Sequence, residues 1–291
     1  MCKKNTTFAD PFEKNQPMEK IKVLFVNQEI TPYLKESHMG KVGRYLPQGI
    51  QEKGKEIRTF MPRFGNINER RNQLHEVIRL SGMNLIIDDT DHPLIIKVAS
   101  IQSARMQIYF IDNEDYFQRK FTFTDKDGGF FDDNDERAIF YSRGVLETVK
   151  KLGWSPDIVH CHGWMTSLIP LYIKRAFHEN PLFSETRVIY SIYNDDFPGS
   201  FKKDFHKKLK MDGITSDDLR HYREPTYINV TKGAMHYADA VILGSEKMNP
   251  EIISHLASLN KPVLNYIPLD KCVDTYSDFY DRVLTKEFVA K

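Results

Sequence analysis

Short apolar runs alternate with amphipathic segments along this chain, and this alternation constrains the fold more than any other feature. Residues 22–26 form an apolar run bounded by polar residues, which predicts a buried strand. Residues 39–53 carry apolar side chains about one helical turn apart, Gly54 ends the predicted helix, and residues 56–61 predict the next strand. A strand, a helix and a second strand in this order predict parallel strands joined by a right-handed crossover.

The same alternation continues downstream. Further strands are predicted at residues 85–87, 94–98, 107–111, 158–162, 188–192 and 240–243, and helices at 166–177, 228–238 and 276–289, together with one that runs to residue 152. Asn134 or Asp135 is the expected cap of the helix that ends before Gly153. The predicted fold class is therefore α/β: a single doubly wound, Rossmann-like domain whose mostly parallel sheet has strands 22–26 and 158–162 near its centre.

Charge and cysteine content exclude several classes of protein. The 291 residues include 41 basic and 40 acidic side chains, so a broad basic surface for nucleic acid is not expected. Cys2, Cys161 and Cys272 lie far apart, which suits a reducing compartment such as the cytoplasm. No apolar run approaches the length of a membrane span. Residues 1–17 lack the apolar core of a secretory signal, and we expect a disordered leader followed by a folded segment at 18–291.

Several short motifs follow one another in a fixed order. They are Thr31-Pro32-Tyr33-Leu34-Lys35, Asp132-Asp133-Asn134-Asp135-Glu136-Arg137, Pro156-Asp157-Ile158-Val159-His160-Cys161-His162-Gly163-Trp164 and Tyr237-Ala238-Asp239-Ala240-Val241. In this order they resemble the N-terminal half of bacterial glycogen and starch synthases over about residues 21–250. The resemblance implies that residues 18–291 are the N-terminal catalytic domain, without the second Rossmann domain of that family. It also implies transfer of glucose from ADP-glucose to an α-1,4-glucan, with no cofactor.

The loop after the first strand is the first candidate site. The family has a lysine, a threonine and two glycines here, which hold the sugar nucleotide. In this chain Lys35 matches the lysine, Glu36, Ser37 and His38 follow it, and Gly40 is the glycine that remains. The resemblance implies that Lys35 and Gly40 bind substrate. The alternative is a solvated loop, because two added side chains and a negative charge oppose a phosphate at a backbone that glycine would leave bare.

The strand at 158–162 carries the second candidate. Strand periodicity places His160 and His162 on one face and Cys161 on the other. Zinc needs three or four ligands, and no other cluster has matching spacing, so no metal is expected. The resemblance places His162 in the donor-sugar pocket as a catalytic residue, although Gly163 and Met165 replace an aspartate and a histidine of the family. The alternative is a histidine that is hydrogen-bonded at the end of a strand.

Three further residues complete the expected site. By resemblance Asp133 is a catalytic carboxylate that opens the helix before the histidine strand and reaches the cleft. The alternative role of Asp133 is a helix N-cap. Tyr193 stands where the family has a histidine, and Asn194 follows it at a strand end that faces the sugar. Tyrosine can stack on a sugar ring but cannot exchange protons near neutral pH as imidazole does.

Two hypotheses about function follow from these residues. In the first, the chain is a glycogen or starch synthase domain that is weak or inactive alone, and a partner chain completes its cleft. In the second, it is a non-catalytic relative that binds glucan or regulates glycogen metabolism. A polar groove lining the cleft would indicate sugar binding, whereas an exposed apolar patch would indicate a docking partner.

Overall fold

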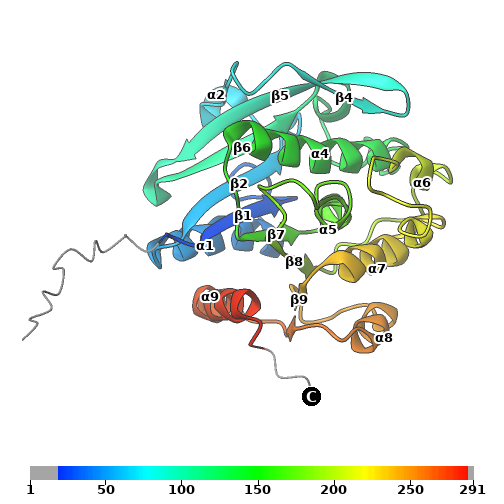
Figure 1. Ribbon diagram of the computed structural model, residues 1–291. Coiled ribbons are helices and arrows are strands. Elements are labelled where there is room, and N and C mark those ends of the chain that lie inside the picture. The colour runs from blue at the N-terminus through cyan, green and yellow to red at the C-terminus, as the bar shows by residue number, and fades with distance from the viewer. Residues whose placement is uncertain (1–18, 288–291) are drawn as a thin grey trace, which may run out of the picture.

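The computed structural model describes residues 19–287 and places a ten-stranded sheet through the middle of this part of the chain (Figure 1). The strands are β1 (Lys22–Asn27), β2 (Glu56–Pro62), β3 (His75–Glu76), β4 (Met83–Ile87), β5 (Thr90–Ile101), β6 (Met106–Asp112), β7 (Ile158–His162), β8 (Arg187–Ile192), β9 (Ala240–Leu243) and β10 (Val263–Leu264). Their order is β10-β9-β8-β7-β1-β2-β6-β5-β3, with β4 paired to β5.

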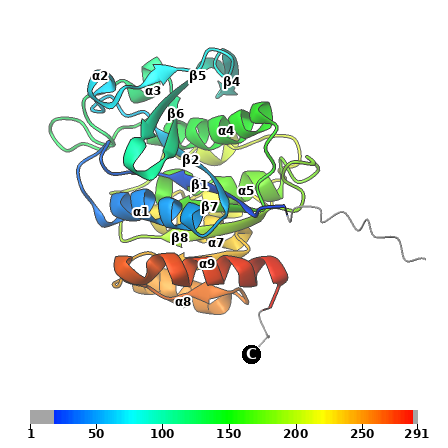
Figure 2. The same cartoon turned by 90° about the vertical axis from the view of Figure 1, so that its left-hand side faces the viewer.

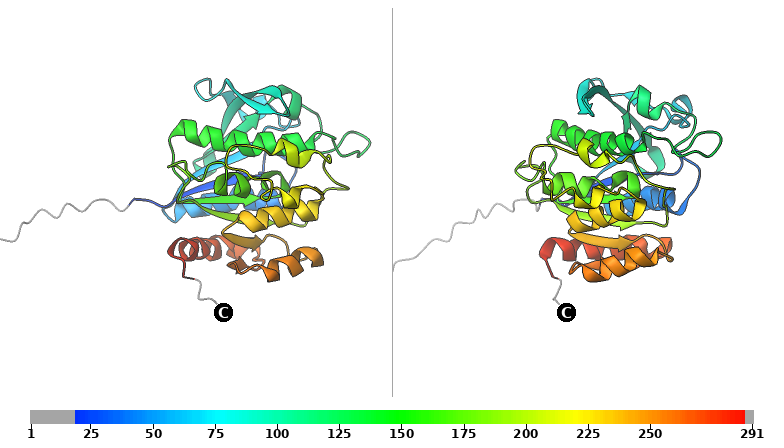
Figure 3. Two further views of the ribbon diagram at one scale, coloured as in Figure 1. Left: turned by 45° about the vertical axis from the view of Figure 1, so that its right-hand side comes forward. Right: turned by 90° about the vertical axis from the view of Figure 1, so that its right-hand side faces the viewer.

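The strand directions confirm the predicted mostly parallel sheet. Every neighbouring pair from β10 to β6 is parallel, and β1 and β7 lie side by side at the centre. Among the ten strands of residues 19–287, only the pairs that involve β5 are antiparallel. The hairpin of β4 and β5 lies beside α4 at the edge of the molecule (Figure 3).

Helices cover both faces of the sheet, as the doubly wound prediction requires. One face carries α1 (His38–Glu52) and α9 (Leu269–Thr285), and the other carries α4 (Asn134–Leu152), α5 (Ile169–Lys174), α7 (Tyr227–Tyr237) and α8 (Pro250–Ser258) (Figure 2). Val23 and Phe25 of β1 pack toward α1 and α9, whereas Leu24 and Val26 pack toward the other layer. Shorter elements are α2 (Glu69–Asn72), α3 (Glu114–Phe117), α6 (Phe205–Lys208) and the 3₁₀ turns Gln102–Ala104, Trp164–Thr166 and Arg220–Tyr222.

Two predicted helices differ from the observed ones. The segment predicted as one helix at 166–177 is a 3₁₀ turn followed by the short α5, whose N-terminal turn contains Pro170. The C-terminal helix predicted at 276–289 begins earlier, at Leu269 directly after Pro268, and ends at Thr285. Residues 288–289 and the expected leader at 1–17 lie outside the described residues.

The contact between α1 and α9 is close and specific. A Cβ added at Gly49 of α1 would lie 2.5 Å from both methyl carbons of Val273, so only glycine permits this approach of the two helices. Lys53 pairs with Asp274 at 2.7 Å, and Lys55 pairs with Asp281 at 3.0 Å. The helix α9 therefore forms part of the layer that covers β1, β7, β8 and β9.

Within residues 19–287, none of the helices has the length and the apolar content that crossing a membrane requires.

Candidate functional site

The carboxyl ends of β1, β7, β8 and β9 meet at one edge of the sheet, and the loops that leave them form the candidate site. The Gln28 N–H donates to the His162 carbonyl at 3.1 Å, which joins the ends of β1 and β7. The Gly244 N–H donates to the Ile192 carbonyl at 2.7 Å, which joins the ends of β8 and β9. In open α/β sheets, ligands bind at this edge.

The N-terminus of α1 lies at this edge and is occupied by side chains of the chain itself. The Ser37 hydroxyl caps the helix by accepting from the Gly40 N–H at 2.9 Å. The same hydroxyl donates to the Glu29 carboxylate at 2.5 Å. A helix N-terminus attracts anions, and here a carboxylate already lies next to it. Gly40 fits closely at its position, because a Cβ there would lie 3.0 Å from the Thr31 hydroxyl oxygen, which would have to shift.

The other residues of this loop do not share one contact: each lies in a different environment. Lys35 is exposed just before the helix begins. Glu36 pairs with Lys41 at 2.6 Å, so a cation offsets its negative charge. The His38 ring lies 6.4 Å from the ring of Tyr193, and burial lowers the pKa of His38. An imidazole side chain thus stands beside the α1 N-terminus, as the sequence indicated.

The two histidines of β7 are wholly buried and point to the same face, as predicted, with Cys161 on the other face. His162 Nδ1 lies 2.9 Å from the Tyr193 hydroxyl. His160 Nδ1 lies 2.6 Å from the Tyr280 hydroxyl. Burial lowers the pKa of His162 to about 3 and that of His160 well below its ordinary value, so both rings are neutral at physiological pH. His162 Nε2 is buried and has no hydrogen-bond partner among residues 19–287.

This burial predicts a pH dependence of stability that can be assigned to His162. The pKa of His162 is about 3 in the fold and returns to about 6.5 in the unfolded chain. Below pH 6.5 the unfolded state therefore binds more protons, and the stability that neutral His162 contributes is lost as the pH falls toward 3. From pH 6.5 to 4.5 this loss is about 2 kcal/mol.

Urea unfolding of the wild type and a His162→Asn variant checks this prediction. Asparagine does not titrate, so the difference in free energy of unfolding between the two proteins should shrink by that amount over the interval. The comparison cancels other titrating groups, such as Asp195, whose raised pKa has the opposite sign. A constant difference between pH 6.5 and 4.5 would contradict the prediction.

The loop after β8 lies next to His162. The Tyr227 hydroxyl lies 2.7 Å from the Tyr193 carbonyl oxygen and 3.1 Å from Asp195 Oδ1. The Trp164 N–H donates to Asp195 Oδ2 at 3.3 Å. Asn194 is exposed, and its N–H donates to the Ser245 hydroxyl at 3.0 Å. The loops after β7, β8 and β9 are thereby tied to one another.

Asp195 is a residue of this site that the sequence did not single out. Burial raises the pKa of its carboxyl to about 7, and the negative charge of Glu29 adds to the effect. Its position directly after the residues Tyr193 and Asn194 was the available signal. The contacts of Asp195 with Trp164 and Tyr227 could not be predicted from the spacing of residues in the sequence, because they join segments about 30 residues apart.

A cavity of about 160 Å³ opens beside this loop. Its lining includes Tyr193, Asn194, Asp196, Tyr227, Lys247 and Asn249. Amide, carboxylate and ammonium groups next to aromatic rings provide both the hydrogen bonds and the stacking faces that a sugar requires. Met248 and Ile252 add apolar surface, so the lining is mixed and is neither a purely polar groove nor an apolar docking surface.

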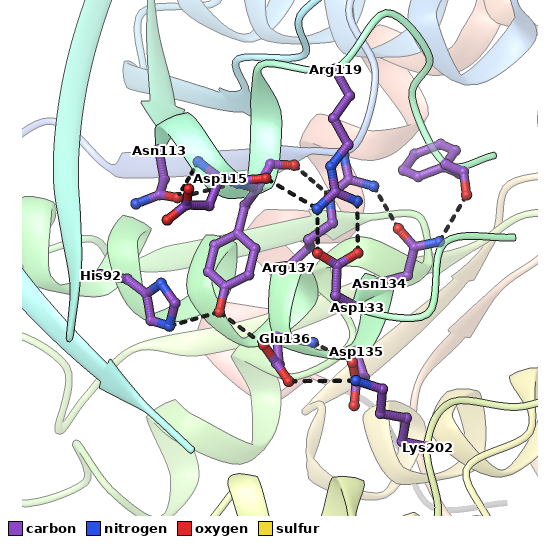
Figure 4. A network of polar contacts seen from close by, with 12 residues as sticks. His92, Asn113, Asp115, Arg119, Asp133, Asn134, Asp135, Glu136, Arg137 and Lys202 are labelled. Carbon is purple, nitrogen blue, oxygen red and sulfur yellow. Dashed lines mark hydrogen bonds and ion pairs between the residues drawn. The ribbon is translucent and has the colours of Figure 1, made fainter. Parts of the chain in front are cut away.

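Asp133 occupies the N-cap position of α4, but its side chain does not cap the helix, so the predicted capping role is wrong. The expected caps Asn134 and Asp135 lie inside the helix. The carboxylate of Asp133 instead forms a two-point ion pair with Arg119, with Nη1 and Oδ1 at 2.7 Å and a second contact between Nη2 and Oδ2 (Figure 4). A bidentate pair of this kind holds both side chains in one orientation.

The rest of this network fixes the start of α4. Glu136 accepts from the Tyr116 hydroxyl at 3.0 Å and lies 2.5 Å from Lys208 Nζ. Buried Arg137 donates through Nε to the Tyr116 carbonyl at 2.7 Å (Figure 4). The network of α3, α4 and α6 therefore has a clear structural role.

The structure thus joins some predicted site residues and leaves others apart. His162, Tyr193 and Asn194 lie together, and Gly40 belongs to the helix turn beside His38. In the part of the chain that the structure describes, neither Lys35 nor Asp133 shares a hydrogen bond or ion pair with that group. No three His, Cys, Asp or Glu side chains of residues 19–287 are grouped as metal ligands.

Comparison with known proteins identifies relatives of this chain. The family model of the starch synthase catalytic domain matches residues 22–261. Glycogen synthase of Chlorobium limicola is 35% identical over 235 residues, which cover 80% of this chain and 47% of that protein. Glycogen synthase of Chlorobaculum tepidum is 34% identical over 265 residues, which cover 90% of this chain and 52% of that protein. This chain therefore spans about half the length of the curated relatives it matches.

A solved structure shows the same fold. The catalytic domain of starch synthase IV from Arabidopsis thaliana, bound to ADP and acarbose, has a TM-score of 0.68 and 19% sequence identity, with 86% of this chain and 52% of that chain covered. The family match extends from β1 to the segment before β10 and thus includes every loop of the candidate site. The chain belongs to the starch synthase catalytic domain family, as the order of its motifs indicated.

Proposed function

We propose that this chain contributes to glucosyl transfer from ADP-glucose to the end of an α-1,4-glucan, as the N-terminal catalytic domain at residues 18–291. The family membership supports the reaction class. One observation supports the location of the site: His162, Tyr193 and Asn194 lie together beside a cavity of mixed polar and apolar lining at the carboxyl edge of the sheet. The cytoplasm, where such substrates occur, is the proposed location.

The roles proposed for these residues follow from their chemistry. The amide of Asn194 and the ring of Tyr193 are suited to sugar hydroxyls and to a sugar face, respectively. Neutral His162 supports Tyr193 through the bond to its hydroxyl. Asp133, held by Arg119, is the proposed catalytic carboxylate by resemblance. Lys35 and Gly40 are proposed contacts of the donor at the start of α1.

The start of α1 is poorly suited to bind the phosphates of the donor. The N-terminus of α1 is capped by Ser37, with the Glu29 carboxylate beside it. In the family, a second domain supplies a basic pair for the phosphates. We therefore propose that the phosphate contacts come from outside residues 19–287, and that a partner polypeptide completes the cleft.

A second candidate function is glucan binding without catalysis. Glu29 lies close to the α1 N-terminus and interacts electrostatically with Asp195. The negative charge of Glu29 disfavours a nucleoside diphosphate there. An uncharged maltooligosaccharide meets no such repulsion. The two candidates differ in whether ADP-glucose binds at this edge.

Calorimetric titration with maltoheptaose, ADP-glucose and ADP tests both candidates. Asn194→Ala is the informative variant, because Asn194 is exposed and its loss should leave the fold intact. We expect weaker binding by about three- to tenfold, the effect of one hydrogen bond. Asn84→Ala, at an exposed position of β4, is the matched control. Equal affinities of the wild type and Asn194→Ala, or no binding by the wild type, would remove this cavity as the sugar site.

A further inference from the structure

The helix α9 reaches the candidate site through one hydroxyl group. Tyr280 of α9 is fully buried, and its hydroxyl lies 2.6 Å from His160 Nδ1 of β7. These residues are 120 positions apart in the sequence, so the bond forms only when α9 is docked on the sheet. The contact lies in the same layer as the Gly49–Val273 contact of α1 and α9.

His160 is held at both nitrogens. Its Nε2 lies 2.7 Å from the Ser191 hydroxyl of β8. A neutral imidazole has one donor and one acceptor nitrogen, and a hydroxyl can serve either one, so the two hydroxyl partners satisfy both nitrogens and together fix the orientation of the ring. The ring of His160 has little freedom to move in this arrangement.

The fixed ring of His160 lies directly against His162. The two ring centroids are 3.9 Å apart, and both side chains are completely buried. His162 in turn bonds the hydroxyl of Tyr193, a residue of the cavity wall. A chain of contacts therefore runs from α9 through His160 and His162 to the cavity.

We propose that Tyr280 is a positioning residue for the sugar site: its hydroxyl orients His160, which sets the placement of His162 and Tyr193. The inference rests on the proposed function only in taking the cavity as the ligand site. Tyr280 does not line the cavity, its contact with Tyr193 runs through His160 and His162, and it is not itself proposed to contact a ligand. Docking of α9 is thus coupled to the shape of the site.

Tyr280→Phe tests this proposal, because it removes only the hydroxyl. Tyr276→Phe is the matched control: Tyr276 lies one turn earlier on α9, is 2% exposed and has its ring 5.8 Å from His160, but it is Tyr280 whose hydroxyl bonds that histidine. Ser191→Ala, which removes the other partner of His160, is the second test variant.

The first readout is the imidazole ¹⁵N signals of His162 in the ligand-free protein. We expect them to shift in Tyr280→Phe and in Ser191→Ala, and to stay unchanged in Tyr276→Phe. A merely structural loss of stability does not move the signals of a folded protein in this selective way. Unchanged His162 signals in Tyr280→Phe, or equal shifts in Tyr276→Phe, would overturn the proposal.

The second readout is the affinity for maltoheptaose. We expect Tyr280→Phe to weaken it by about three- to tenfold, with Tyr276→Phe equal to the wild type. If the wild type binds no maltoheptaose, the proposed sugar site fails, and the NMR signals alone still decide whether Tyr280 positions His162. If the wild type binds and Tyr280→Phe binds equally well, the proposed site stands and the positioning role fails.

Discussion

The 291-residue chain alone is expected to elongate glycogen more slowly than a full-length relative, by about two orders of magnitude or more. The reason lies in the donor phosphates. The N-terminus of α1 at this edge is capped by Ser37, and a carboxylate, Glu29, lies next to it. Each charge-assisted hydrogen bond to a phosphate contributes about 1.5–3 kcal/mol, so two missing contacts suffice for the expected loss.

Transfer of labelled glucose from ADP-glucose to glycogen measures this rate. Glycogen synthase of Chlorobaculum tepidum, which this chain matches over about half its length, is the positive control. A Glu29→Gln variant adds a second arm: removal of the negative charge should strengthen binding of ADP to the chain without restoring transfer. A turnover within about tenfold of the control enzyme would contradict the prediction, since it would mean that this chain supplies the phosphate contacts itself.

The central sheet could be predicted from the sequence, because the buried strands of a parallel sheet are short runs of apolar residues. The runs at 22–26 and 158–162 became β1 and β7 at the centre of the sheet. The antiparallel direction of the strands around β5 could not be predicted, because an apolar run does not show which strand it pairs with or in which direction. The early start of α9 could have been predicted from the sequence, since its buried side chains recur at helical spacing. They are Cys272, Tyr276, Phe279, Tyr280 and Val283.

The sequence was sufficient to predict where residues of the candidate site lie, but not which side chains they contact. Residues that follow strands 158–162 and 188–192 had to lie at one edge, and His162, Tyr193 and Asn194 do so. The hydrogen-bond partners of these residues could not be predicted, because the bonds of His162 to Tyr193 and of Trp164 to Asp195 depend on the register of β7 with β8. For Asp133 local reasoning favoured a cap, and a tertiary contact with Arg119 took precedence.

Removal of α9 by truncation after residue 268 is expected to abolish cooperative folding of the chain. The truncation would uncover apolar side chains of β1, β7, β8 and β9, among them Phe25, Ile158 and Ile189. It would also remove the buried side chains of α9: Cys272, Tyr276, Phe279, Tyr280 and Val283. A large buried apolar side chain contributes about 1.5–3 kcal/mol, so the summed loss is comparable to the whole stability of a typical domain.

Circular dichroism and urea unfolding of the truncated chain check this expectation. The result should be a loss of the cooperative transition that the full chain shows. If the truncated chain unfolds with the midpoint of the full chain, α9 is not part of the core layer. Point variants at the contact of α1 and α9 test the same docking without deleting chain.

Gly49→Ala places a methyl group against the stiff, β-branched side chain of Val273, at 2.5 Å from its methyl carbons. Overpacking of this kind costs about 1–3 kcal/mol, whereas alanine in a helix gains about 0.5–1 kcal/mol over glycine. The cost of the clash exceeds the gain in helix propensity, so the free energy of unfolding should fall. Val273→Ala makes room for the new methyl group. The double variant should therefore be more stable than the two single effects add up to, whereas strict additivity would show that α1 and α9 do not meet at this point.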